Sequence, residues 1–170
     1  NTSFLFNNFS YNVNIGVTDA KISVKSVIQD YGLKEDLDYF LDTKNKLKFG
    51  FLTTIHTILP GVITSSDTTK RININLSKNY GWENAIYAQH EVTLWGNTSL
   101  NYGARLSTYS VVGPGNYYEF KPNDVVDSFH LAFGKFGKTY VNIEPRLSIS
   151  CNFYKNMSFK VAYSRNVQNL

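Results

Sequence analysis

The stretch Val141–Tyr154, VNIEPRLSISCNFY, alternates between apolar and polar residues. The apolar series is Val141, Ile143, Pro145, Leu147, Ile149, Cys151 and Phe153. The polar series is Asn142, Glu144, Arg146, Ser148, Ser150, Asn152 and Tyr154. Because successive side chains of a strand point to opposite faces, this pattern predicts a β-strand between two different environments. The stretch is also much longer than an ordinary strand of about 5–6 residues.

Period-two alternation recurs along the rest of the chain. The further alternating segments are Phe9–Ile15, Tyr31–Leu41, Leu47–Leu59, Trp82–Leu94, Leu100–Val112 and Phe159–Asn166. Together with Val141–Tyr154 they predict seven strands that run alternately up and down.

The predicted connections sort by length. Short turns are expected at Asp42–Lys46, Gly96–Thr98 and Tyr154–Met157. Longer polar connections are expected at Val17–Val24, Pro60–Tyr80 and Gly113–Lys138. Outer-membrane barrels have short periplasmic turns and longer extracellular loops, so this alternation favours a barrel over a soluble sandwich.

The composition agrees with strands and excludes several other classes. Twelve Tyr and twelve Phe accompany only 18% charged residues, and the net charge of +4 is scattered, so no nucleic-acid footprint is visible. One cysteine excludes an internal disulfide framework, and no apolar run reaches the length of a transmembrane helix. Aromatic residues gather near the short turns, as in a membrane-interface girdle: Tyr39, Phe40, Phe49, Trp95, Phe153, Tyr154 and Phe159.

Seven strands do not close a barrel, because bacterial single-chain barrels begin at eight and use even numbers. The expected fold is therefore all-β, an antiparallel wall of a transmembrane β-barrel. Residues 1–170 would form part of one barrel domain, with the remaining strands supplied from elsewhere. Both ends of the sequence read as cuts through a longer protein.

Three hairpins resemble a known family. They are IEPRLSIS at Ile143–Ser150 followed by FKVAYSRNVQNL at Phe159–Leu170, DYGLKEDLDYFLDTKNKLKFGF at Asp30–Phe51, and WENAIYAQHEVTLWGNTSLNY at Trp82–Tyr102. Each is similar to a hairpin of the TonB-dependent outer-membrane receptors of Bacteroidetes-type bacteria, and they occur in the same order. The chain departs from the family pattern at Glu35, where an apolar residue is usual, and at Cys151, where Tyr is common.

The resemblance implies a barrel of about 22 strands with an N-terminal plug and a TonB box, neither of which lies in these residues. It further implies a bacterial outer-membrane receptor that imports a large nutrient, such as a glycan, a peptide or a metal chelate, without a cofactor. The implied partners are outer-membrane lipids, the protein's own plug and remaining strands, the TonB complex and a surface lipoprotein, with no nucleic acid. Two alternatives stay open: a passive porin without a plug, and a soluble secreted β-sandwich that binds a ligand.

By parity, one set of charged side chains should face the barrel lumen. The candidates are Lys34, Asp36, Asp38, Glu91, Arg105, Glu144 and Arg146. They could contact the plug or a substrate, or simply form cross-strand ion pairs in a solvated lumen, each worth about 0.2–1 kcal/mol.

The connection Gly113–Lys138 is rich in aromatic residues and glycine. Its candidate ligand contacts are Tyr117, Tyr118, Phe120 and Phe129, which could stack on sugar rings or on a siderophore. The alternative is that these rings pack the loop against the mouth of the barrel.

Catalysis and metal binding are not expected. His56, His90 and His130 have no metal-ligand spacing with acids or with cysteine, and His90 and Glu91 are neighbours whose side chains should point to opposite faces. No nucleophile elbow frames a serine. Cys151 falls on the lipid-facing parity and reads as a small hydrophobic residue.

Overall fold

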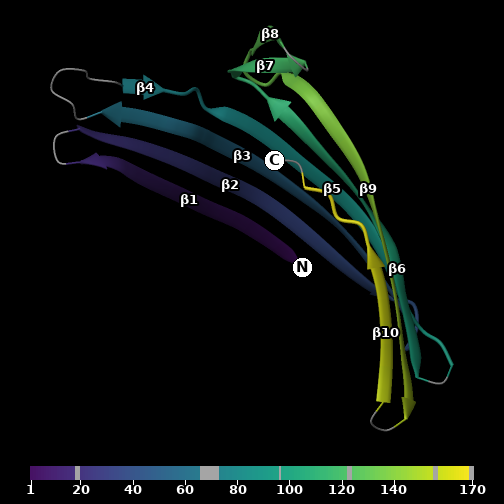
Figure 1. The fold of residues 1–170 in the computed structure, drawn as a ribbon. Helices are drawn as coiled ribbons and strands as arrows, with labels where there is room; N and C mark the ends of the chain where they lie inside the picture. The colour runs from purple at the N-terminus through teal and green to yellow at the C-terminus, as the bar shows by residue number, and fades with distance from the viewer. Residues whose placement is uncertain (18–19, 66–72, 96, 122–123, 155–156, 169–170) are drawn as a thin grey trace.

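The computed structural model describes residues 1–17, 20–65, 73–95, 97–121, 124–154 and 157–168 (Figure 1). Its strands are β1 (Thr2–Val17), β2 (Ala20–Phe40), β3 (Asn45–Ser65), β4 (Asn73–Asn75), β5 (Asn79–Thr93), β6 (Thr98–Val112), β7 (Gly115–Lys121), β8 (Asp124–Leu131), β9 (Phe136–Tyr154) and β10 (Met157–Ser164). Among the described residues there is no apolar helix of membrane-spanning length.

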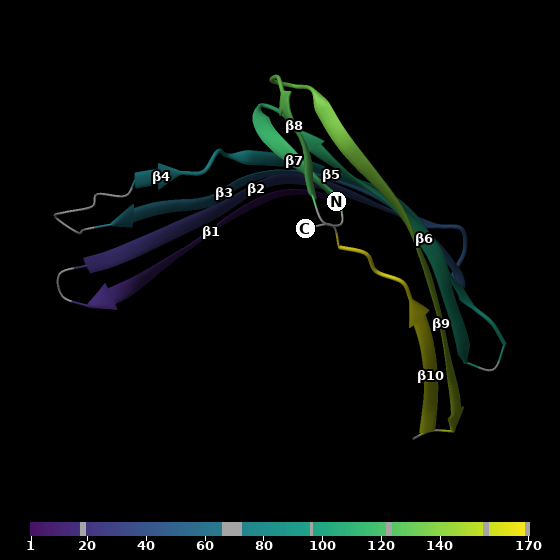
Figure 2. The same ribbon diagram turned by 45° about the horizontal axis from the view of Figure 1, so that its top comes forward.

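The main sheet is an antiparallel meander in the order β1-β2-β3-β5-β6-β9-β10, with the short strand β4 paired to β3. The seven strands predicted from alternation are therefore confirmed. The sheet is curled into a half-barrel, and its hollow side holds the segment that follows β10 (Figures 1 and 2). Strands β1 and β10 end the order, so the described sheet is an open wall.

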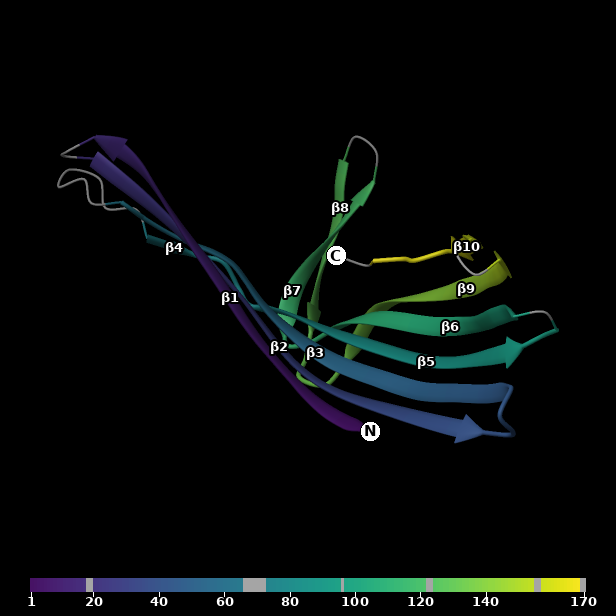
Figure 3. The same cartoon turned by 90° about the horizontal axis from the view of Figure 1, so that it is seen from below.

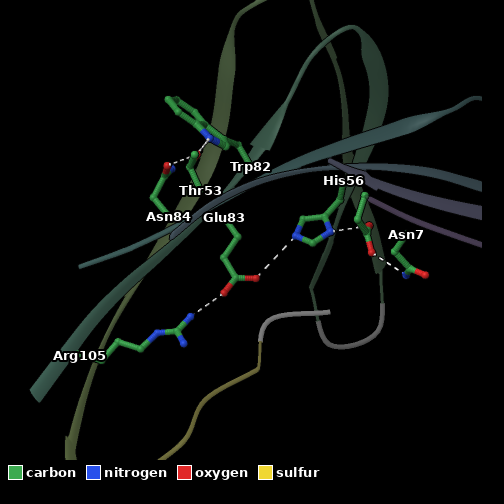
Figure 4. A network of polar contacts seen from close by, with 8 residues as sticks. Asn7, Thr53, His56, Trp82, Glu83, Asn84 and Arg105 are labelled. Atoms are coloured by element: carbon green, nitrogen blue, oxygen red, sulfur yellow. Dashed lines mark hydrogen bonds and ion pairs between the residues drawn. The ribbon is translucent and has the colours of Figure 1, made fainter. Parts of the chain in front are cut away.

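The two faces of this wall differ in chemistry. Trp82 lies on one side and its neighbour Glu83 on the other, with His56 and Arg105 on the side of Glu83 (Figure 4). The side of Glu83 is the concave face. On the convex face Ile86, Leu147 and Val161 are each 50% exposed or more.

A conventional core is almost absent from the described residues. In the part of the chain that the structure describes, no large side chain is fully buried, and Ala85 is the one buried hydrophobic residue. Burial of apolar side chains is the dominant favourable term in folding. Among the described residues, the sheet therefore gains little stability from buried apolar side chains.

The apolar series changes face along β1. Phe6 packs on Tyr31 with ring centroids 5.1 Å apart, on the convex parity. Further along the same strand, Phe9, Tyr11, Val13 and Ile15 fall on the concave parity, and Asn8, Ser10, Asn12 and Asn14 take the convex one. The sequence predicts that these two series lie on opposite faces of the strand. It does not predict that the apolar series lies on the concave face.

The first connection is shorter than predicted. The expectation of a long loop at Val17–Val24 is wrong, because β1 runs to Val17 and β2 begins at Ala20. Ile15 pairs with Ile22 and Val17 with Ala20, so the strand ladder satisfies the backbone groups of this segment. The apolar residues Ile22 and Val24, two positions apart, are the sequence signal that β2 begins before Val24.

The two other long connections contain further strands. β3 continues past Pro60 to Ser65, and β4 pairs with it at Val62–Thr64. Strands β7 and β8 form a separate two-stranded sheet between β6 and β9. This hairpin projects toward the hollow side of the main sheet, the side of the segment that follows β10 (Figures 2 and 3).

The short turn after β2 is built on Asp42. Its carboxylate accepts hydrogen bonds from the Lys44 amide at 2.7 Å and from the Asn45 side chain at 2.8 Å. The Lys44 amide, followed by the Asn45 side chain, lowers the pKa of Asp42 below its usual 3.8. Such side-chain contacts to the backbone are typical of Asx turns.

We expect Asp42→Ala to lower the stability of the folded protein at neutral pH. Because the carboxylate has a lower pKa when folded, its contribution is present above pH 3.8 and is lost as the pH falls through the folded value. The difference in urea midpoint between the wild type and Asp42→Ala should therefore shrink below pH 3.8. A difference that stays constant from pH 7 to pH 2 would show that the charge of Asp42 plays no part.

Gly50 on β3 is a point of close approach. It pairs with Tyr87 on β5, and a Cβ at Gly50 would overlap the Tyr87 ring and lie 2.6 Å from the Glu35 carbonyl oxygen. The absence of a side chain lets Tyr87 lie across the strand and donate a hydrogen bond to Asp36.

We expect Gly50→Ala to destabilise the protein by about 1–2 kcal/mol through overpacking and to displace Tyr87 from Asp36. Gly61→Ala on the same strand is the matched control, since the nearest atoms to its Cβ would lie 3.7 Å away. Urea unfolding of both variants measures the effect. Equal midpoints for the two alanine variants would contradict the close packing of Tyr87.

Candidate functional site: a polar ladder on the concave face

A chain of polar contacts crosses the concave face from β1 to β5 (Figure 4). The Asn7 amide donates to Asp30 at 3.0 Å, and the other oxygen of Asp30 lies 2.8 Å from Nδ1 of His56. On the far side of the imidazole, Nε2 lies 3.6 Å from Glu83. Polar contacts thus link side chains on four strands, β1, β2, β3 and β5.

The ladder continues through Arg105 to β9. Arg105 on β6 bonds Glu83 at 3.1 Å, and its Nε lies 3.9 Å from Glu144. This Nε makes no hydrogen bond within the described residues. Acidic and basic side chains therefore alternate along the ladder from Asp30 to Arg146, and His56 adds a positive charge when it is protonated.

Glu144 is the most buried charge of the site, with 3% of its surface exposed. Ser107 donates a hydrogen bond of 2.7 Å to it, and Arg146 lies 3.9 Å from its second oxygen. A buried carboxylate is stable only when it is paired and hydrogen-bonded. Arg146 in turn donates to Asn166 of the C-terminal segment at 3.3 Å.

A second cluster surrounds Asp36 near the short-turn end. Its carboxylate lies 2.7 Å from Lys34 and 3.6 Å from Lys48, and it also accepts the hydroxyl of Tyr87. Lys46 and Asp38 form a neighbouring pair at 3.2 Å. Three lysines here lie beside Asp36 and Asp38, and Glu91 lies in register with Lys46 on the same face.

A concavity of about 210 Å³ lies between the two clusters. Its charged lining consists of Lys34, Lys48, Arg105 and Arg146, with Gln89 and Tyr87 beside them. Gly103 lies at its floor, where a Cβ would overlap the Ala88 carbonyl oxygen. These four cations are already paired with Asp36, Glu83 and Glu144. The hollow between them can still hold a polar group of a ligand or of another protein segment through the remaining donors.

The predicted lumen-facing residues all fall on one face. Lys34, Asp36, Asp38, Glu91, Arg105, Glu144 and Arg146 share the concave parity in the strand registers. The structure brings six of them into the contacts above. Glu91 is exposed and lies in register with Lys46 and Asn101.

The predicted loop aromatics lie on the β7–β8 hairpin. Tyr117 stacks on Phe129 with centroids 6.0 Å apart, and its hydroxyl donates to the Val112 carbonyl at 2.8 Å and accepts from the Tyr80 amide at 3.3 Å. Tyr117 thus fastens the hairpin to the sheet, as the packing alternative expected. Phe129 keeps 38% of its surface exposed. Tyr118 and Phe120 pair with Ser128 and Val125 through the backbone, and their side chains lie outside the described residues.

Sequence reasoning missed Asn7, Asp30 and Ser107 as members of the ladder. They come from strands far apart in sequence, and the register between strands brings them together: Asn7 opposite Asp30, and Asp30 opposite His56. His56 was considered only as a metal ligand. Among the described residues, no group of three or more His, Cys, Asp or Glu side chains is arranged so that it could hold a metal ion.

No protein-family model, no curated protein and no solved structure matches the chain.

Proposed function

We propose that this chain is a stretch of wall from an outer-membrane β-barrel, and that the barrel is a TonB-dependent receptor that imports a large nutrient into the periplasm. The observation that carries the proposal is the contrast between a curled, exposed apolar face and an ion-paired polar face. A barrel in a membrane needs an apolar outside and tolerates a polar inside.

The height of the convex apolar band supports a membrane. On β2 the band runs from Tyr31 to Tyr39, on β3 from Leu47 to Ile55 and on β5 from Trp82 to Val92. These lengths match the roughly 9–11 residues with which a tilted strand spans a bilayer. Glu35 interrupts the band on β2, where it pairs with the N-terminal ammonium and accepts the Thr2 hydroxyl. Above the band the inversion on β1 turns polar side chains outward, as expected where the wall leaves the hydrocarbon for water.

Polar side chains within the band form hydrogen bonds with one another. The Trp82 indole N–H donates to Thr53 at 2.8 Å, and Thr53 donates to Asn84 at 2.8 Å. His90 contacts Tyr102 at 2.8 Å and Asn45 at 3.1 Å. Such internal pairing is what polar groups need where water is scarce.

The import function rests on the three hairpins that resemble TonB-dependent receptors. The concave ladder is consistent with it, because a dense set of ion pairs and a basic hollow suit the docking of a polar plug. A passive porin would place the same ladder along an open channel.

Planar-bilayer recording of the whole polypeptide separates these functions. A plugged receptor should give no stable conductance until the plug is loosened with urea, and it should bind the purified periplasmic domain of TonB. A large, stable conductance without urea and no binding of TonB would indicate a porin. Recovery of the protein from the aqueous phase without detergent would support the soluble sandwich.

A further inference from the structure

An apolar pocket opens on the convex face at the long-connection end of the band. It has a volume of about 560 Å³, within the range of small-molecule sites. Ile55, Trp82 and Val112 form its wall on the sheet, and Pro114, Phe133 and Gly134 form the side that lies over them. None of the described residues that line it is charged.

The wall of the pocket is held in place. The Trp82 indole is fixed by its hydrogen bond to Thr53 and packs on Phe136 with centroids 5.6 Å apart. Because the N–H is occupied by Thr53, the indole ring offers the pocket an apolar surface. The opposite side comes from the turn between β8 and β9, where Lys135 donates a backbone hydrogen bond to Ala132 at 3.1 Å and Gly134 adopts a φ of 71°.

We propose that this pocket binds one acyl chain of an outer-leaflet membrane lipid. The inference rests on the proposed function, which places the convex face in lipid. Ile55 belongs both to the apolar band and to the pocket, so a chain could pass from the bilayer into the pocket without crossing water. Phe133, 88% exposed, stands at the rim where it would close over such a chain. The long connections mark this end of the band as the extracellular one, hence the outer leaflet.

Photo-crosslinking tests the pocket in the whole polypeptide, reconstituted in liposomes that contain phosphatidylethanolamine with a diazirine on its acyl chain. Labelled peptides are mapped by mass spectrometry at increasing mole fraction of the probe. We expect labelling around Trp82 and Phe133 to saturate at low mole fraction and to fall at least tenfold when excess unlabelled lipid competes. Labelling of the open band at Ile86 should rise in proportion to the probe.

Val112→Phe should fill the pocket and abolish the saturable labelling, whereas Val161→Phe, the same substitution elsewhere on the convex face, should not. Should Val112→Phe fail to assemble, Phe133→Ala removes the exposed rim and should weaken the saturable labelling severalfold without touching the sheet. Proportional labelling at Trp82, or saturable labelling that survives both Val112→Phe and Phe133→Ala, would overturn the lipid site. Absence of labelling along the whole convex face would instead overturn the membrane proposal.

Discussion

If the convex face meets lipid as proposed, arginine in place of Ile86 should stop the wall from assembling in a membrane. Ile86 lies in the middle of the band on β5 and is 61% exposed. A charge at the bilayer midplane of a barrel costs about 2–4 kcal/mol. On a water-facing surface the same substitution would change stability by no more than about 0.5 kcal/mol. Folding titrations in liposomes and the yield of heat-modifiable protein in cells measure the effect.

Gln89→Arg is the matched control for this variant. Gln89 lies on the same strand, three residues away, on the concave face at the edge of the basic hollow. It should assemble normally, because an added cation there remains in contact with water. If Ile86→Arg and Gln89→Arg assemble equally well, the convex face does not contact lipid.

Replacement of Glu144 by leucine should destabilise the wall by about 2–3 kcal/mol. The substitution leaves the Ser107 hydroxyl without its acceptor and removes the carboxylate next to Arg105 and Arg146. Breaking a fully buried ion pair costs about 3–5 kcal/mol. The expected loss is smaller because 47% of the Arg146 side chain is exposed and can be solvated.

Glu91→Leu is the comparison for Glu144→Leu, since Glu91 is an exposed acid on the same face. Its unfolding midpoint in urea should shift by no more than about 0.5 kcal/mol in free energy. Glu144→Gln should fall between the two, because its amide oxygen can still accept the Ser107 hydroxyl. A Glu144→Leu variant as stable as Glu91→Leu would show that the ladder adds little to the fold.

Much of the wall could be predicted from the sequence, because a strand separates its faces by parity alone. Val141–Tyr154 predicted both the strand β9 and the placement of Glu144 and Arg146 on one side. The same logic placed Lys34 and Asp36 together on β2. These are local properties that need no knowledge of the neighbouring strands.

Parity does not say which face is convex. The series Phe9–Ile15 was recognised, yet its position on the concave face depends on the curvature of the sheet and on its pairing with Val24 and Ile28. The register between two strands likewise cannot be predicted from the sequence of one strand alone. The contacts of Asp30 with Asn7 and His56 join residues 23 and 26 positions apart in sequence.

The hairpin errors have a different origin. Polar residues in Val17–Val24, and glycine, asparagine and aspartate in Gly113–Lys138, predict loops where the structure has strands. Among the described strands, β7 and β8 pair only with each other, and their hairpin projects from the main sheet, so its residues can be as polar as those of a loop. The extension of β2 follows from its pairing with β1.

The central claim, that the convex face meets lipid and the concave face meets water, can be tested along β9. Cys151 is first changed to serine. Single cysteines are then placed on the convex parity at positions 141, 143, 147 and 149, and on the concave parity at positions 142, 148 and 150. Intact outer membranes that carry each variant are treated with a membrane-confined or a water-soluble maleimide. If the convex face meets lipid, reactivity should alternate along β9. The odd positions should react with the membrane-confined reagent and the even positions with the water-soluble one. Reaction of both series with the water-soluble reagent would contradict it.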